Sequence, residues 1–593
     1  MKNIRNMILA IIPKQILRQI PRQMPIRITH ILHICFSISI MSMISFMSEA
    51  HTDRWQGITF FSPRSQGENA VRNIVGRHPF IHQPDSCDNY LTINSTVEYH
   101  HSFRPARIAH VLFGTDKLII SGSEVSSPGP LNPKTHRGPD DILADYFGLS
   151  TKFQSTICMD PFIQWFTFNY SLYAGLDHFI RGLYLNIHIP VVWTKWGLQF
   201  SEIIHAESEN TDYPAGYMDI DPTPVGATSF LKALKGNTTF GTMQDPLKYG
   251  KICGSKTESG LADVHLMLGW DITSSQRGYA GFNLQVVAPT GTRPDSQFLF
   301  EPIVGNGRHW QVGAGFSGRS LIWEEGGVQE LSFFADVNLS HFLKSHQRRS
   351  FDLKKIVNLD TESDACCDNS CDSNDLKEIN YGSRYMLFKD FTAPLPAAIN
   401  LTPVINHTTL CCTVDVAFQM DTVFMFGYTY QDFIFDIGYN GWIRSKERIC
   451  LTNKQPFTNT MYGLKGIQQV TTPGPIHVAS LDTEHLAMIV SPEITGIDTF
   501  PTVQMALADA NPPVFTPSAL IDKRSAASPM VLTHKFFTHV GWQLCSFQRL
   551  NLTHTIGLGG EIEFEGLNER GSVQLNKNTL SQWGVWAYST LNF

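Results

Sequence analysis

The stretch Trp583–Phe593, WGVWAYSTLNF, ends the chain on an aromatic residue. Apolar side chains occupy alternate positions, at 583, 585, 587, 591 and 593, and only Ser589 interrupts them. Successive side chains of a strand point to opposite faces, so this stretch predicts a strand with one apolar face. Chain ends are usually polar and frayed. The question is therefore which solvent this apolar face meets.

The same period of two recurs along the chain. In LADVHLMLGWDI (261–272) the even positions are apolar, whereas Asp263, His265 and Asp271 occupy the opposite face. The pattern predicts twelve strands, at 93–104, 162–172, 183–193, 261–272, 279–288, 310–319, 330–340, 410–430, 433–444, 533–544, 552–564 and 581–593. Each is about as long as a tilted strand that crosses a bilayer. The segment 410–430 is longer, and we expect it to project beyond the bilayer or to break near Asp421.

Connection lengths between these strands alternate between short and long. Residues 431–432 make a short turn, whereas the next connection runs from 445 to 532. Outer-membrane barrels place short turns on the periplasmic side and long loops outside. A soluble sandwich or propeller also alternates apolar and polar residues, but it gives no reason for every second loop to be long. We therefore expect an all-β fold, a single transmembrane antiparallel β-barrel over residues 91–593 with about 12 strands, 14 also being compatible.

The composition agrees with a membrane barrel. Charged residues make up 17% of the chain, hydrophobic residues 42% and aromatic residues 11%, against about 25% charged residues in soluble proteins. No apolar run after residue 50 reaches the roughly 20 residues of a membrane helix. The net charge is −7, and since there is no basic excess, nucleic acid is not an expected partner.

The first 50 residues predict a signal peptide. Basic residues precede the apolar run ILHICFSISIMSMISFM, and the small residues of SEA lie just before His51. A membrane anchor is the alternative. Residues 51–90 then form either a plug inside the barrel or a periplasmic segment, with a helical turn expected over 68–75 because Ser65 precedes Glu68 in a capping-box spacing. Short helices are also expected in the outer loops, near Asp141 and at 226–236.

The C-terminal pattern resembles that of Gram-negative outer-membrane β-barrel proteins inserted by the barrel-assembly machinery, which typically end in an aromatic residue, usually Phe. Phe593 and Leu591 match this assembly signal, and Ser589 departs from it. The resemblance implies export to the outer membrane of a Gram-negative bacterium. It also implies contact with outer-membrane lipid and with the assembly machinery, and it leaves the solute open.

The polar faces of the predicted strands supply charges that are expected to line the lumen. The acidic candidates are Glu98, Asp263, Asp271, Glu330, Asp336, Asp415, Asp421, Asp436, Glu561, Glu563 and Glu565, and the basic ones are Arg104, Arg319, Arg444 and Lys535. A lumen with this acidic excess favours cations. The alternative for each residue is that it pairs with a loop residue and only solvates the wall.

The stretch DTESDACCDNSCDSND (360–375) is the most distinctive loop. Asp364, Asp368 and Asp372 are weak candidates for ligands of a hard cation such as Ca²⁺, although no EF-hand spacing is present. The alternative is a solvated acidic loop held by disulfides. No cofactor is expected. Because the GxSxG, HExxH and P-loop motifs are absent, we expect no enzymatic activity.

These observations lead to two functional hypotheses. The first is an outer-membrane channel or transporter that passes small solutes or hydrophobic nutrients through a partly plugged, acidic lumen. The second is a surface-exposed adhesion or interaction protein whose barrel serves only as an anchor.

Overall fold

The computed structural model describes most of the chain after residue 56. The described residues are 57–83, 88–122, 125, 141–207, 226–241, 243, 245–354, 379–380, 382–390, 400–453, 462–464, 521–547, 552–565 and 580–593. The predicted signal peptide (1–50) lies outside them. No helix among the described residues is long and apolar enough to span a membrane.

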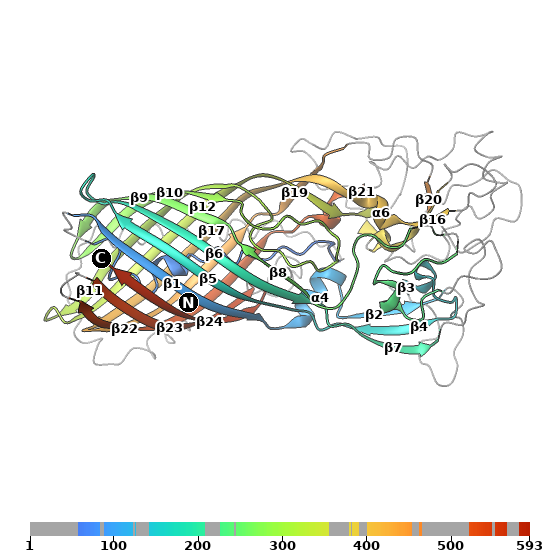
Figure 1. The fold of residues 1–593 in the computed structure, drawn as a ribbon, viewed down its shortest axis with the longest axis horizontal. Helices are drawn as coiled ribbons and strands as arrows, with labels where there is room; N and C mark the ends of the chain where they lie inside the picture. The colour runs from blue at the N-terminus through green and yellow to red at the C-terminus, as the bar shows by residue number, and fades with distance from the viewer. Residues whose placement is uncertain are drawn as a thin grey trace, which may run out of the picture.

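Twelve long antiparallel strands of the described chain form one closed barrel (Figure 1). The barrel strands are β1 (Tyr90–Ser102), β5 (Phe162–Gly175), β6 (Leu183–Gly197), β9 (Val264–Ser275), β10 (Gly278–Ala288), β11 (Gln311–Glu325), β12 (Gln329–Ser350), β17 (Thr409–Tyr430), β18 (Phe433–Arg444), β22 (Val531–Phe547), β23 (Leu552–Glu565) and β24 (Gln582–Asn592). The predicted all-β barrel of about 12 strands is confirmed.

Neighbouring strands pair in chain order, and the last strand closes the ring against the first. Val97 on β1 lies opposite Ala587 on β24, and β12 pairs directly with β17. The short hairpins and the C-terminus lie at one end of the barrel, on the left in Figure 1, and the long connections lie at the other. The expected alternation of short and long connections is therefore present.

The barrel surface is apolar on the outside and polar on the inside. Large apolar side chains face outward along the strands, such as Leu268, Phe282 and Leu558, which is 67% exposed. On β1 the inward side chains are polar, namely Thr92, Asn94, Thr96, Glu98 and His100. An apolar belt around a closed barrel is the surface that a lipid bilayer requires. The chain thus has the architecture of an outer-membrane β-barrel, as its sequence resemblance predicted.

The strand β17 runs unbroken through Asp421 and projects beyond its neighbour β18. Its inner part pairs with β18, whereas its outer part pairs with β19 (Glu447–Leu451). Its pairing with β12 shifts register between Ser340 and Ser345. This irregularity exchanges the two faces of the strand. Inward positions are even-numbered in the outer part of β17, from Cys412 to Val416, and odd-numbered in its inner part, from Gln419 to Gly427.

A folded layer covers the outer end of the barrel. It contains a sheet of β2 (Lys117–Ser121), β3 (Ile142–Leu143), β4 (Gln154–Cys158) and β7 (Ser201–Ala206), with α4 (Pro105–Phe113), η3 (Ala144–Phe147) and α5 (Phe230–Ala233) beside it. Further short elements are β8 (Lys256–Leu261), β13 (Asp352–Lys354), β14 (Ile379–Asn380), η4 (Ser383–Tyr385), β15 (Leu387–Asp390), β16 (Asn400–Pro403), α6 (Val404–Thr408), β20 (Tyr462–Leu464), β21 (Ile521–Asp522) and η5 (Lys523–Ala526). The short helices expected near Asp141 and at 226–236 are thus found as η3 and α5.

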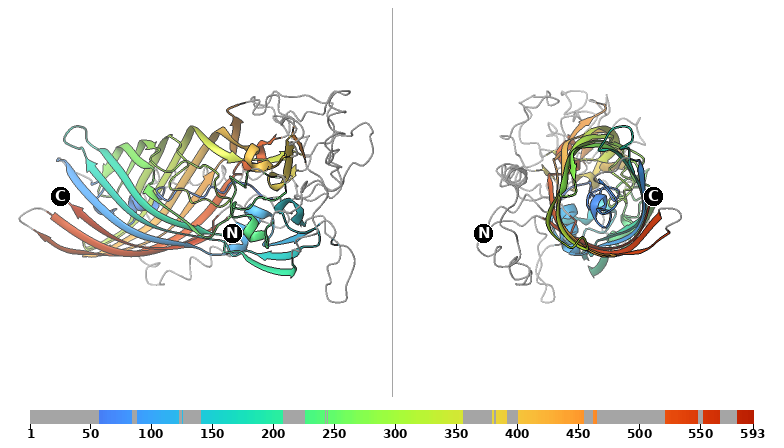
Figure 2. Two further views of the ribbon diagram at one scale, coloured as in Figure 1. Left: turned by 45° about the vertical axis from the view of Figure 1, so that its right-hand side comes forward. Right: turned by 90° about the vertical axis from the view of Figure 1, so that its left-hand side faces the viewer.

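Residues 57–83, called here the N-terminal segment, run inside the barrel. Figure 2, in its right-hand view along the barrel, shows this segment in blue within the ring of strands. It contains one helical turn, α3 (Val71–Ile74). The turn begins later than the capping-box spacing suggested; its N-cap is Ala70, and the Ser65 hydroxyl donates to Asp263 at 3.0 Å.

Candidate functional site

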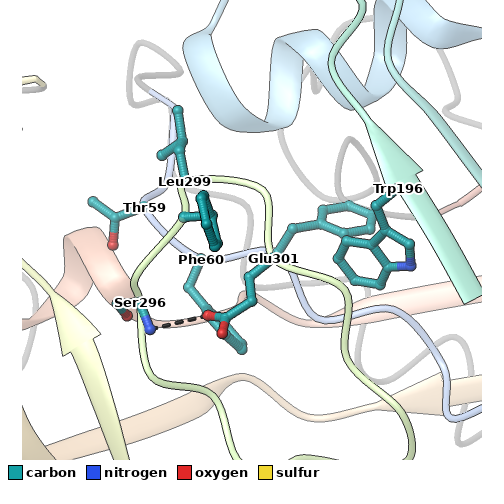
Figure 3. A pocket seen from close by; sticks show the side chains of 8 residues that line it. Thr59, Phe60, Trp196, Ser296, Leu299 and Glu301 are labelled. Carbon is teal, nitrogen blue, oxygen red and sulfur yellow. Dashed lines mark hydrogen bonds between the residues drawn. The ribbon is translucent and has the colours of Figure 1, made fainter. Parts of the chain in front are cut away.

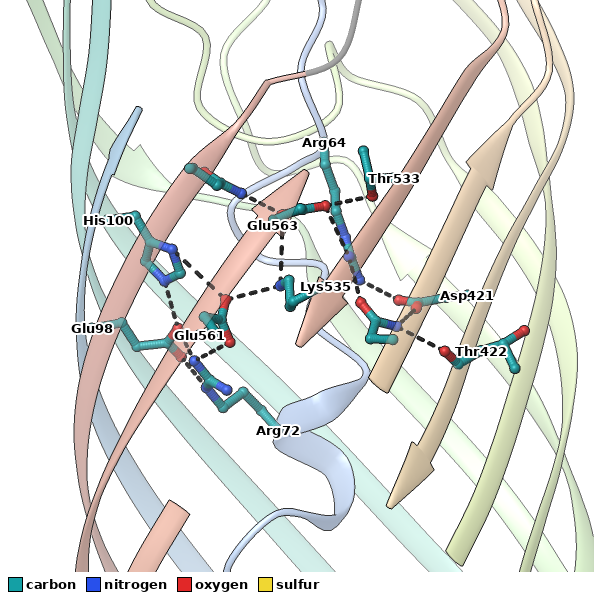
Figure 4. Close-up of polar contacts among 12 residues, drawn as sticks. Arg64, Arg72, Glu98, His100, Asp421, Thr422, Thr533, Lys535, Glu561 and Glu563 are labelled. Atoms are coloured by element: carbon teal, nitrogen blue, oxygen red, sulfur yellow. Dashed lines mark hydrogen bonds and ion pairs between the residues drawn. The ribbon is translucent and has the colours of Figure 1, made fainter. Parts of the chain in front are cut away.

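Arg72 of the N-terminal segment is held by three wall residues (Figure 4). Its Nε and Nη2 atoms donate to the two carboxylate oxygens of Glu98, at 3.0 and 2.9 Å, and Nη2 lies 3.1 Å from Glu561 Oε2. The guanidinium carbon lies 3.6 Å from the centre of the Trp586 ring. A bidentate pair that also stacks on an aromatic ring is the geometry in which arginine cannot be replaced by lysine. Burial lowers the pKa of Arg72, but Glu98 and Glu561 outweigh it and the net shift is upward.

Arg64 makes a similar set of contacts nearer the outer end. It forms an ion pair with Asp421, donates from Nη1 to Asn440 Oδ1 at 2.9 Å, and has Glu563 at 3.8 Å. Lys535 connects the two arginine sites, with its Nζ 2.9 Å from Glu561 and 3.8 Å from Glu563. The result is one buried charge network that joins the N-terminal segment to β1, β17, β22 and β23 (Figure 4).

Asp436 on β18 binds the turn that follows α3. The Gly76 amide donates to Asp436 Oδ2 at 2.8 Å, and His78 Nε2 lies 3.0 Å from Oδ1. His539 of the wall lies 2.9 Å from Oδ2. Gly76 has a φ of 64°, and a Cβ there would lie 2.6 Å from the Tyr588 ring, so only glycine fits this close approach. A single buried carboxylate thus holds two groups of the N-terminal segment.

A third contact lies toward the hairpin end of the barrel. His82 Nδ1 lies 2.8 Å from Asp271 Oδ2, and its ring stacks on Tyr279 with centroids 4.2 Å apart. Tyr173 and Tyr184 contact the same ring edge-on. The N-terminal segment is therefore attached to acidic wall residues along its length.

Apolar packing adds to these polar contacts. Val71, Ile74 and Val75 are buried against wall side chains that include Phe334 and Phe537. Arg77 differs from Arg64 and Arg72, because in the described chain no carboxylate contacts it and Nη1 donates only to the Arg72 carbonyl oxygen, at 3.4 Å. Burial lowers the pKa of Arg77 to about 10.

The outer end of the N-terminal segment borders a small pocket (Figure 3). Phe60, Phe61, Trp196 and Glu301 are among the residues that line it, and its cavity volume is about 10 Å³, which is about the space of one water molecule. Ligand pockets usually hold about 300–1,000 Å³, so the pocket is small for a solute. The Ser296 amide donates to Glu301 Oε2 at 2.9 Å. Burial, together with the neighbouring Asp295, raises the pKa of Glu301 to about 8.

Most of the predicted lumen charges lie on the inner wall. Those that contact the N-terminal segment are Glu98, Asp263, Asp271, Asp421, Asp436, Arg444, Glu561 and Glu563. Lys535 lies among them and pairs with Glu561 and Glu563 of the wall. Arg319 and Glu330 pair with each other on β11 and β12, and Asp336 accepts from Asn338 at 2.9 Å. Nothing is described of the Glu565 side chain.

Two predicted lumen residues lie elsewhere. Arg104 follows the end of β1, where it is exposed and has a left-handed φ of 66° at the start of α4. Asp415 lies in the outer part of β17, where the inward positions are Cys412, Val414 and Val416. The register shift in β17 turns Asp415 away from the interior, because one displaced residue exchanges the two faces of a strand.

The basic partners of these carboxylates were not predicted from the sequence. Arg64, Arg72, His78 and His82 all come from the N-terminal segment, which was expected only as a plug or a periplasmic piece. One signal pointed to them: an acidic lumen was predicted, and the segment carries arginines and histidines within about 20 residues. Charge complementarity between the two could have placed them together.

The C-terminal residues close the barrel at its hairpin end. The Phe593 amide donates to the Leu91 carbonyl oxygen at 2.9 Å, and the side chain of Phe593 is 48% exposed. Leu591 pairs in register with Ile93. The candidate metal ligands Asp364, Asp368 and Asp372 lie outside the described residues, and among the described ones no cluster of three or more His, Cys, Asp or Glu is placed to hold a metal ion.

Comparisons with known proteins add structural likenesses only. No family model matches the chain, and no curated protein matches its sequence. An outer-membrane channel from Pseudomonas putida F1 is 10% identical, with 85% of this chain and 95% of that chain covered and a TM-score of 0.28. A FadL homologue from Pseudomonas aeruginosa is 7% identical, with 91% and 99% covered and a TM-score of 0.25. The toluene transporter TbuX from Ralstonia pickettii is 8% identical, with 85% and 88% covered and a TM-score of 0.22. Because these TM-scores lie below 0.5, we draw no conclusion about this chain from them.

Proposed function

We propose that the protein is an outer-membrane channel for small solutes and that the N-terminal segment closes its lumen. The observation that carries this proposal is the way the interior is filled. The wall alone does not fill it; a separate stretch of chain does, and charge pairs attach this stretch to polar and acidic wall residues. A barrel that served only as an anchor would not need a polar inner wall that a separate stretch of chain covers.

The charge of the wall favours cations among these solutes. Of the wall carboxylates, Glu561 and Glu563 have the wall cation Lys535 beside them. Glu98 and Asp421 form their ion pairs with Arg72 and Arg64 of the N-terminal segment. When the segment moves aside, the lumen becomes acidic. Confined carboxylates of this kind raise the local concentration of cations.

Planar-bilayer conductance of the purified full-length protein tests the proposal. We expect the wild type to open rarely, and the double variant Arg64→Ala/Arg72→Ala to conduct in stable cation-preferring steps. Arg319→Ala is the matched control, because this arginine pairs with Glu330 of the wall and is not bonded to the N-terminal segment. A folded double variant that stays silent contradicts a channel and supports a surface protein whose barrel is an anchor.

Hydrophobic nutrients are a second class of solute, and one feature favours them. The pocket at the outer end is lined by Phe60, Phe61, Trp196, Phe298 and Leu299, and such a surface suits an apolar molecule if the pocket enlarges. Uptake of a neutral aromatic hydrocarbon by cells that carry the protein measures this directly. Uptake that Trp196→Ala reduces supports this class, and uptake equal to that of cells without the protein contradicts it.

A further inference from the structure

The wall residues around Arg72 recognise the shape of its head group as well as its charge. Glu98 accepts two parallel hydrogen bonds from it, and Trp586 stacks on its flat face at 3.6 Å. Two carboxylate oxygens in a fork and an aromatic face select a planar cation that has several N–H donors. An ammonium ion could satisfy the charge but not this geometry.

The recognition geometry belongs to the barrel and not to the N-terminal segment. Glu98 on β1 lies directly opposite Trp586 on β24, and Gly559 on β23 is opposite Trp586 on its other side. A Cβ at Gly559 would lie 2.2 Å from the Trp586 ring, so the glycine leaves room for the ring against the wall. The strands therefore position these groups independently of residues 57–83.

The wall does not neutralise these carboxylates by itself. Lys535 Nζ lies 2.9 Å from Glu561, whereas the ionisable group that contacts Glu98 from the described part of the wall is the imidazole of His100, at 3.2 Å. Removing one partner of a buried ion pair leaves an uncompensated charge, which costs about 3–5 kcal/mol. Loss of Arg72 therefore leaves at Glu98 a place where a bound cation gains binding energy.

The arrangement occurs a second time in the lumen. Arg64 contacts Asp421, has Glu563 at 3.8 Å, and lies with its guanidinium carbon 5.6 Å from the Trp442 ring centre. Both sites combine a guanidinium of the N-terminal segment, carboxylates of the wall and a wall tryptophan. Lys535 lies between them and contacts a carboxylate of each.

We propose that Glu98, Glu561 and Trp586 form a binding subsite for a solute that carries a guanidinium or a similar planar cation, and that Arg72 occupies this subsite as an internal substitute. Asp421, Glu563 and Trp442 form the corresponding subsite for Arg64. The proposal rests on the function proposed above, because in the wild type a solute takes the place of Arg72 only when the N-terminal segment moves aside. It gives the solute class of that channel.

Calorimetric titration of the full-length protein in detergent tests the subsite. The probe is argininamide, and its neutral isostere citrullinamide is the control ligand. We expect Arg72→Ala to bind argininamide at least about tenfold more tightly than the wild type, because the variant vacates the subsite, and we expect citrullinamide not to bind. Adding Glu98→Gln to Arg72→Ala should abolish the binding.

Arg77→Ala is the matched control variant. It removes a buried arginine from the same segment, but in the described chain this arginine has no carboxylate partner, so its removal vacates no acidic site. Binding to Arg72→Ala that is no tighter than binding to Arg77→Ala, or equal binding of the two ligands, overturns the proposal. The heat-dependent mobility of the barrel on gels shows whether Arg72→Ala folds. If it does not, Arg72→Met takes its place in the titration, because methionine keeps the volume of the aliphatic part of the arginine side chain.

The titration separates the two proposals because it does not depend on conduction. Binding of argininamide to a barrel that never conducts overturns the channel and retains the subsite. Conduction by the opened barrel, without any preference for argininamide over citrullinamide in the titration, overturns the subsite and retains the channel.

Discussion

Replacing Asp436 by alanine should release the turn after α3 from the barrel wall. The carboxylate of Asp436 accepts from the Gly76 amide at 2.8 Å and lies 3.0 Å from His78 Nε2, and its side chain is fully buried. Alanine removes both contacts and introduces no group that could replace them. The variant also loses the contact with His539, but that loss falls on the wall and does not loosen the N-terminal segment directly.

The size of the effect follows from these two contacts. A buried amide left without an acceptor costs about 1–3 kcal/mol, and a hydrogen bond to a charged group contributes about 1.5–3 kcal/mol. Together they amount to about 2.5–6 kcal/mol of the free energy that holds this turn against the wall. Because about 1.4 kcal/mol corresponds to a factor of ten, the equilibrium for local opening should rise by about two to four orders of magnitude.

Hydrogen exchange with mass spectrometry measures this opening in peptides that cover residues 57–83. We expect their protection to fall in Asp436→Ala, while peptides from the barrel strands keep theirs. Asp336→Ala is the control, because Asp336 is a buried wall carboxylate whose described hydrogen bond goes to Asn338 of the same strand. Equal protection of residues 57–83 in the two variants, with both barrels folded, would refute the role given to Asp436.

Three further predictions concern other parts of the molecule. The pKa of Glu301 is about 8 in the folded chain against an ordinary value of 4.5, so the stability that Glu301 gives its loop is complete below about pH 4.5 and is lost as the pH rises through 8. Exchange of residues 290–303, corrected for the intrinsic rate, should accelerate between pH 6 and 9 in the wild type and not in Glu301→Gln. Deleting Phe593 removes the exposed aromatic and its paired bonds with Leu91, and the amount of heat-modifiable barrel in the membrane fraction should fall, whereas unaltered assembly contradicts the signal role. Leu558→Arg places a charge on the lipid-facing side, at a position that is 67% exposed. Near the bilayer midplane such a charge should lower the free energy of unfolding by about 2–4 kcal/mol, measured by urea unfolding from vesicles. Leu558→Val is the control and should have a much smaller effect.

The barrel was predictable because its signal is local. A strand with one face toward lipid must alternate apolar and polar residues, and the pattern in 261–272 or 583–593 is complete within about a dozen positions. Ser589 interrupts the pattern, but the structure places its hydroxyl 2.9 Å from His554 Nε2 on the neighbouring strand β23. The partner that satisfies a polar group on the outer face is not visible in the local sequence.

The lumen was only partly predictable because its contacts are not local. Arg64 pairs with Asp421 across 357 positions of the chain, and no spacing in the sequence announces such a pair. Asp415 was assigned to the wrong face for a related reason. The register shift in β17 arises from its pairing with β12, and the alternation of residues within β17 alone does not reveal it.

The chemistry of the attachment explains why a channel would be closed in this way. A segment held mainly by apolar side chains would expose them to water on release, and the hydrophobic effect would oppose every opening. A buried ion pair behaves differently, because the cost of removing both charges from water offsets much of their attraction. Arg64, Arg72 and their carboxylates therefore specify where the N-terminal segment binds, and the net free energy they contribute stays small as long as another cation can take the vacated position. On this reasoning the charge pairs allow exchange between the segment and a solute, and the apolar contacts of Val71, Ile74 and Val75 set how often the segment leaves.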